Sequence, residues 1–62
     1  MLAMKKDIII VDDEKDIREL ISGILIDQGF ETRLAKDIDS LKIELIKRVP
    51  SLILLDVWLN KR

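Results

Sequence analysis

The 62-residue sequence contains no cysteine and no histidine, and these two absences exclude several kinds of site. Without cysteine, the chain can form neither a disulfide nor a thiolate metal site. Without histidine, it lacks the usual zinc ligand and the usual general base. Any chemistry must therefore come from carboxylates, lysines or hydroxyl groups.

Long apolar runs and an excess of one charge are also missing. The longest unbroken apolar run is four residues, too short to span a membrane, and no signal-peptide core follows the amino-terminal lysines. The 11 basic and 12 acidic residues are mixed along the chain, so no basic face indicates nucleic-acid binding. We expect a cytoplasmic segment that contacts neither membrane nor nucleic acid.

Three stretches have the pattern of β-strands within a composition that is 48% hydrophobic and 37% charged. Residues 8–11 are a continuous β-branched run, typical of a strand buried on both faces of a parallel sheet. Residues 52–55 are a second continuous apolar run, so we expect the same burial there. Residues 30–35 alternate between apolar and polar, as a half-exposed edge strand does. We expect residues 57–62 to form a loop.

Two stretches have the period of amphipathic helices. Acidic residues suit the start of the first helix, and Gly29 is placed to end it with a left-handed cap. The second helix is expected to begin at Asp37 or Asp39 as its N-cap and to end at Pro50. The expected apolar stripes are Ile17, Leu20, Ile21, Ile24 and Leu25 in the first helix, and Ile38, Leu41, Leu45 and Val49 in the second.

The order β-α-β-α-β predicts an α/β fold with a parallel sheet and crossover helices. The two continuous strands should be central and the alternating strand peripheral, which gives the strand order 2-1-3 with one helix on each face. The first and third strands are then neighbours at a topological switch point, where open α/β sheets bind ligands.

Three aspartates are expected to meet at this switch point. Asp12 and Asp13 follow the first strand, and Asp56 follows the third. Because like charges repel, such a cluster favours a cation, and magnesium prefers carboxylates together with water and phosphate oxygens. The ion would also let a carboxylate attack a phosphoryl group. Asp12 and Asp13 alone would be typical of a helix cap, and Asp56 alone of a turn at the end of a strand, but the three together favour metal and phosphate chemistry.

Two sequence motifs resemble a known family. Residues 8–14 with Asp16-Ile17-Arg18, and residues 54–59, are similar to the start and the phosphorylation segment of a response-regulator receiver domain. That domain is the flavodoxin-like module of two-component signalling in regulators of transcription. The tryptophan at position 58 and the Gly-Phe-Glu-Thr segment at residues 29–32 resemble the NtrX-type nitrogen-regulation receivers in particular.

The resemblance implies a role for each acidic residue. Asp56 would accept a phosphoryl group from a sensor histidine kinase, and the module would not itself be an enzyme. Asp13 and Asp56 would ligate Mg²⁺ directly, and Asp12 would act mainly through a bound water. The main-chain carbonyl of Trp58 would complete the protein's share of the coordination.

The sequence departs from the receiver pattern in its extent. A receiver normally has five strands and five helices, whereas residues 1–62 hold three strands, so we interpret them as a partial receiver domain. The fourth strand of a receiver brings a Thr or Ser to the phosphoryl group, and the fifth brings a Lys. Lys61 has no motif support as a replacement, and Asn60-Lys61 stands where Pro-Gly often follows the phosphorylation segment.

Two alternatives remain open at this stage. The segment could be a structural or interaction module that works without phosphotransfer, since the outer edge of the third strand has no partner and favours self-association, for example as a homodimer. It could also be a haloacid-dehalogenase-like phosphohydrolase, which uses an Asp after its first strand. That class requires a second Asp two residues later, and this position is Glu14, so this alternative ranks last.

Overall fold

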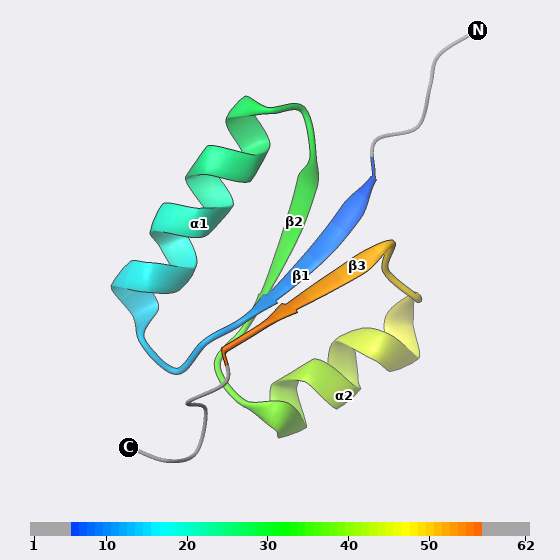
Figure 1. Cartoon of the computed structure of the whole chain (residues 1–62). Coiled ribbons are helices and arrows are strands. Elements are labelled where there is room, and N and C mark those ends of the chain that lie inside the picture. Colours follow the sequence, from blue (N-terminus) through cyan, green and yellow to red (C-terminus); the bar gives the residue numbers. More distant parts are fainter. Residues whose placement is uncertain (1–5, 57–62) are drawn as a thin grey trace, which may run out of the picture.

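The computed structural model describes residues 6–56, which form a three-stranded parallel sheet with one helix on each face (Figure 1). In chain order the elements are β1 (Asp7–Val11), α1 (Lys15–Asp27), β2 (Glu31–Ala35), α2 (Ile38–Lys47) and β3 (Leu52–Leu55). The strand order is β2-β1-β3. The predicted fold class, element order and strand order are therefore confirmed, while the loop predicted at residues 57–62 lies outside the described residues. Neither described helix is long and apolar enough to cross a membrane.

The central strand β1 is the best-buried element of the molecule. All five of its residues are buried, and Ile9 and Val11 pack with Ala35 of β2 and Leu41 of α2 in one apolar cluster. Burying one such aliphatic side chain contributes about 2 kcal/mol, so this cluster stabilises the packing of α2 on the sheet. It also fixes the end of β1, from which the acidic residues follow.

The predicted cap at Gly29 is confirmed and closes α1. Gly29 has a φ of +96°, a conformation that glycine adopts without the steric cost of a β-carbon. Its N–H donates to the carbonyl of Ile26 at 2.9 Å, and the N–H of Phe30 donates to the carbonyl of Leu25 at 3.1 Å. This pair of bonds is a Schellman motif, and it turns the chain directly into β2.

The second helix begins at the first of the two predicted caps. Asp37 accepts a hydrogen bond from the N–H of Ser40 at 2.8 Å, and Asp39 lies in the first turn. The pKa of Asp37 is below its ordinary value because the Ser40 N–H donates to the charged form. The carboxylate therefore satisfies one of the free N–H groups at the start of the helix.

The predicted end of α2 was wrong by one turn. The helix ends at Lys47, and Arg48 is already extended, with φ −170° and ψ 139°. Val49, expected on the apolar stripe, lies outside the helix and is 81% exposed. The reason is steric, because the residue before a proline is disfavoured in the helical conformation, and the chain leaves the helix before it reaches Pro50.

The expected burial of the third strand was also wrong. Leu52 and Leu55 are 51% and 52% exposed, and no Cα atom of either helix lies within 8 Å of a Cα atom of β3. Both helices lie over β1 and β2, and α1 is tied to β2 by a 2.6 Å hydrogen bond between the hydroxyl groups of Ser22 and Thr32. Much of the α1 stripe is consequently exposed too: Ile17, Leu20 and Ile24.

A cluster of charged residues joins the amino end of β1 to β2 and α2. The carboxylate of Asp7 accepts hydrogen bonds from Arg33 at 2.5 and 3.1 Å and from Arg48 at 3.2 Å. Arg33 also donates to the main-chain carbonyl of Glu44 at 2.8 Å and lies 3.4 Å from its carboxylate. We call these four residues, Asp7, Arg33, Glu44 and Arg48, the amino-end cluster.

Each acidic side chain of the amino-end cluster is paired with a basic one. The hydrogen bond from Arg33 holds the pKa of Asp7 below its ordinary value, and the same bond raises the pKa of Arg33. The pKa of Glu44 is lowered, mainly by Lys47 and also by Arg33. Arg48 is exposed, but it also takes part in this pairing.

Candidate metal and phosphoryl site

The pairing of β1 with β3 places Asp12 beside Asp56. Val11, the last residue of β1, is in register with Leu55, the last residue of β3, so the next residue of each strand is an aspartate. The N–H of Asp56 donates to the carbonyl of Val11 at 3.0 Å, which continues the ladder to the edge of the sheet. The two carboxylates therefore leave adjacent strand ends at the predicted switch point.

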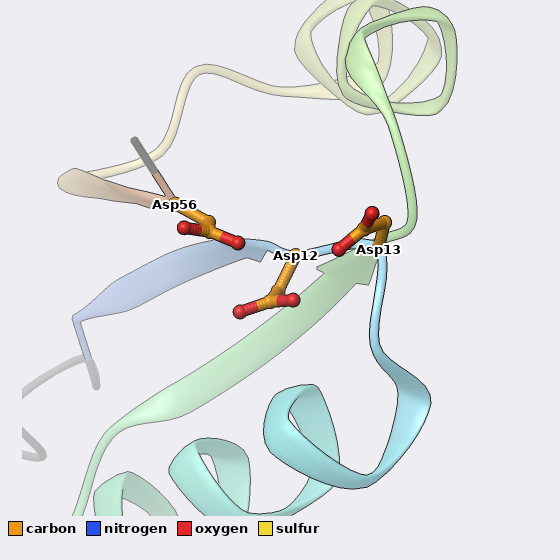
Figure 2. Close-up of side chains that lie close together, drawn as sticks. All are labelled: Asp12, Asp13 and Asp56. Atoms are coloured by element: carbon orange, nitrogen blue, oxygen red, sulfur yellow. The ribbon is translucent and has the colours of Figure 1, made fainter. Parts of the chain in front are cut away.

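Asp13 joins them from the loop between β1 and α1. Each of Asp12, Asp13 and Asp56 offers a carboxylate oxygen, and these oxygens lie within 4.8 Å of one another. Figure 2 shows Asp12 in the middle, with Asp56 on one side and Asp13 on the other. The structure thus brings together all three acidic residues that the sequence predicted.

The three carboxylates differ in exposure. Asp12 is buried at 7% exposure, Asp56 is half-buried with Oδ2 covered, and Asp13 is exposed. Asp12 and Asp56 border an open pocket of about 310 Å³, whose apolar wall includes Ile10, Ile21 and Leu54. A small ligand can therefore reach the carboxylates from solvent while resting against the end of the sheet.

Asp12 is held at three points by its neighbours. Its N–H donates to the carbonyl of Ala35 at 3.1 Å, which attaches it to β2. Its Oδ1 accepts a 2.9 Å hydrogen bond from the N–H of Glu14, and its main-chain carbonyl accepts a 2.7 Å hydrogen bond from Nη1 of Arg18. The bond to Glu14 forms a turn before the helix, and the N-cap of α1 is Glu14 without a side-chain capping bond, so the capping role considered for Asp12 is not present.

The spacing of the carboxylates fits a magnesium ion. Magnesium–oxygen distances are about 2.1 Å, so two oxygens on opposite sides of an octahedral ion are about 4.2 Å apart. Oxygens within 4.8 Å of one another suit an ion that is held by some carboxylates directly and by others through water. The donor set is also suitable, since it consists of hard oxygen ligands alone.

One predicted ligand lies outside the described residues, and two interactions in the structure were not predicted from the sequence. Trp58, whose main-chain carbonyl was expected to ligate the metal, lies outside the described residues. The sequence analysis named Arg18 only as part of a motif and did not predict its hydrogen bond to Asp12. The available signal was a basic residue six positions after Asp12, near the start of the expected helix. The pairing of Asp7 with Arg33 was not predicted either, because the partners are 26 residues apart.

Comparisons with known proteins identify the family of the chain. The model of the response regulator receiver domain matches residues 8–62. The nitrogen assimilation regulatory protein NtrX of Azorhizobium caulinodans is 52% identical over 57 residues, which are 92% of this chain and 13% of that protein. The phosphate regulon transcriptional regulatory protein PhoB of Escherichia coli is 41% identical over 56 residues, which are 90% of this chain and 24% of PhoB.

A solved structure supports the same relationship. The crystal structure of NtrX from Brucella abortus in complex with ADP matches with a TM-score of 0.87 and 53% identity over 92% of this chain. The present chain spans 13% of that chain's length. These findings confirm the resemblance to receivers, including the NtrX type, and favour the receiver over the phosphohydrolase alternative. The chain therefore belongs to the response regulator receiver domain family.

Proposed function

We propose that residues 1–62 form the first part of a receiver domain in which Asp56 accepts a phosphoryl group from a sensor histidine kinase, with Mg²⁺ as cofactor. The observation that carries the proposal is the convergence of Asp12, Asp13 and Asp56 at the carboxyl ends of two adjacent parallel strands. The segment is a substrate of the kinase and not itself an enzyme. Any output on transcription would belong to a longer protein or to a separate chain.

The chemistry follows from the position of Asp56. A carboxylate oxygen of Asp56 forms a bond to phosphorus while the bond from phosphorus to the donor breaks, and the donor leaves with that electron pair. The product is an acyl phosphate. Bound Mg²⁺ would offset the negative charges of the carboxylates and of the phosphoryl oxygens, which otherwise repel one another.

The three aspartates divide the coordination. Asp13 and Asp56 would ligate Mg²⁺ directly, and Asp12 would act through a water molecule. The division is supported by the hydrogen bond from Glu14 N–H to Oδ1 of Asp12, which turns this carboxylate toward the start of α1. The main-chain carbonyl of Trp58 is proposed as a further ligand on the resemblance alone. The Thr or Ser and the Lys that receivers carry on later strands lie outside this sequence.

Phosphorylation by a small donor tests the proposal. We would incubate the chain with acetyl phosphate and Mg²⁺ and measure the intact mass. The wild-type chain should gain the mass of one phosphoryl group, and the gain should be lost in Asp56→Asn or on removal of Mg²⁺. Asp39→Asn, which changes an exposed aspartate in α2, is the matched control and should behave as wild type. An adduct that persists in Asp56→Asn contradicts the proposal.

A second candidate function is self-association through β3. The strand carries unusually exposed apolar side chains for a folded domain, with Leu52 and Leu55 both about half exposed. A strand of this kind at a sheet edge pairs readily with a second copy. The segment could then serve as an interaction module, although a second copy brings no additional Thr or Lys of the kind that receivers use.

Sedimentation velocity distinguishes a dimer from a monomer. The wild-type chain should sediment as a concentration-dependent dimer, and Leu52→Lys should shift it to the monomer. Ile43→Lys is the control, because Ile43 is similarly exposed at 57% but lies on α2, away from β3. A folded monomer at all concentrations, or equal effects of the two substitutions, would exclude pairing through β3.

A further inference from the structure

We propose that Arg18 is a positioning residue for the metal site, acting through the main-chain carbonyl of Asp12. The inference rests on the proposed function and extends it to a residue that touches neither metal nor phosphoryl group. Its basis is the 2.7 Å hydrogen bond from Nη1 of Arg18 to the Asp12 carbonyl oxygen. A charged donor makes a hydrogen bond of this kind shorter and stronger than a neutral one.

The bond connects two rigid elements across the acidic loop. Arg18 is fixed in α1, where its own N–H donates to the carbonyl of Glu14 at 3.0 Å. Asp12 is fixed to β2 by the bond from its N–H to the carbonyl of Ala35. The guanidinium group therefore holds the end of the sheet and the start of the helix at a set separation.

The carbonyl that Arg18 holds belongs to the peptide plane between Asp12 and Asp13. Because a peptide unit is planar, fixing its oxygen fixes the direction in which the chain continues to the Cα of Asp13. Asp13 is exposed, whereas Asp12 and Asp56 are anchored by ladder bonds to neighbouring strands. Arg18 thus sets the position of the least buried of the three carboxylates.

The positioning role and a plain charge effect predict opposite results. A cation close to a site for Mg²⁺ repels the ion, so removal of its charge alone should make metal binding tighter. Loss of the bond to the Asp12 carbonyl should instead leave Asp13 less well placed and make metal binding weaker. The sign of the change in Mg²⁺ affinity therefore decides between the two.

The experiment is a Mg²⁺ titration by isothermal calorimetry on the 62-residue chain and three variants. Arg18→Met should raise the dissociation constant about tenfold, the range seen when a residue supporting metal ligands is removed. Arg18→Lys keeps the charge and part of the donor capacity, so it should give an intermediate value. Lys15→Met is the matched control, since it removes a charge from the first turn of α1, where Lys15 is paired only with Glu19 in the described contacts.

Each outcome has a defined meaning. The unfolding midpoint in urea is measured for every variant, and dissociation constants are referred to the folded fraction. Tighter or unchanged Mg²⁺ binding by Arg18→Met overturns the inference, as does a Lys15→Met chain weakened to the same degree. If Arg18→Met does not fold, Arg18→Lys decides, and an affinity equal to wild type overturns the inference. Failure of the wild-type chain to bind Mg²⁺ would instead contradict the proposed function.

Discussion

Two buried aspartates flank the ends of β1, Asp7 as its first residue and Asp12 directly after its last, and the two ends are built in opposite ways. Asp7 and Asp12 have similar exposures of 8% and 7%. Asp7 is surrounded by two arginines that neutralise it, whereas Asp12 lies beside two further carboxylates. The same residue type thus has opposite electrostatic surroundings at the two ends of one strand.

The amino end of β1 therefore contributes to stability, whereas the carboxyl end carries the proposed site. At the amino end, matched charges tie β1, β2 and α2 together, and nothing there requires a ligand. At the carboxyl end, the carboxylate oxygens lie within 4.8 Å of one another, and each pair repels by about 1 kcal/mol in water-like surroundings. This repulsion lowers the stability of the chain, and it is the reason why we propose that a divalent cation binds there. The comparison predicts that equivalent substitutions at the two ends have opposite effects.

Asp7→Asn should give the largest effect, a loss of about 3 kcal/mol in the free energy of unfolding. The substitution removes the nearer of the two carboxylates that pair with Arg33, whose side chain is only 16% exposed, and loss of one partner from a buried ion pair is costly. Urea unfolding followed by circular dichroism measures the change. A loss below about 0.5 kcal/mol, the usual range for surface substitutions, would show that the amino-end cluster does not stabilise the fold.

Asp13→Asn should have a smaller effect of the opposite sign in the absence of divalent cations. Removal of one of three neighbouring negative charges should raise the free energy of unfolding by about 1 kcal/mol. In saturating Mg²⁺ the wild type should be the more stable of the two proteins, because the variant lacks one metal ligand. The same urea experiment, with and without Mg²⁺, tests both statements, and destabilisation by Asp13→Asn without metal would end the contrast between the two ends.

Acid should weaken the amino-end cluster in particular. The pKa values of Asp7 and Glu44 are lowered from 3.8 and 4.5, so their contribution to stability is complete above those values. It is lost as the pH falls through the lowered values of the folded state. Wild-type stability should therefore decline below about pH 4.5, and Asp7→Asn should flatten this decline. If the stability of both proteins declined equally with falling pH, Asp7 would not be responsible for the decline.

Arg48→Gln should give the smallest change, below about 1 kcal/mol. The Arg48 side chain is 60% exposed, and exposed ion pairs contribute little because water and salt screen them. Thermal unfolding of this variant beside Arg33→Gln measures the relative weight of the two arginines. If Arg48→Gln were as destabilising as Arg33→Gln, burial would not determine the strength of these pairs.

The sequence was sufficient for those features that depend on neighbouring residues. The strands, the Gly29 cap and the Asp37 cap each follow from a few adjacent residues and their known conformational preferences. The acidic site was predictable for the same reason, because Asp12 and Asp56 directly follow apolar strands, Asp13 is the next residue after Asp12, and parallel strands bring their carboxyl ends together.

Features that depend on distant partners were not predictable in this way. The apolar pattern of residues 52–55 indicates a strand that is suited to burial, but the cover over that strand depends on where both helices lie. The pairing of Asp7 with Arg33 and of Arg18 with the Asp12 carbonyl likewise depends on tertiary geometry. Val49 was misplaced because the effect of Pro50 extends further back into the helix than the apolar period alone indicates.

The most direct test of the central claim, that Asp12, Asp13 and Asp56 form a magnesium site, is the stability of the chain as a function of Mg²⁺ concentration. A ligand that binds only the folded state raises the free energy of unfolding by about 1.4 kcal/mol when its concentration is ten times the dissociation constant. Wild type should gain this stability, and the Asp13→Asn, Asp56→Asn double variant should gain none. Equal responses of the two proteins, or no response of the wild type, would contradict the account.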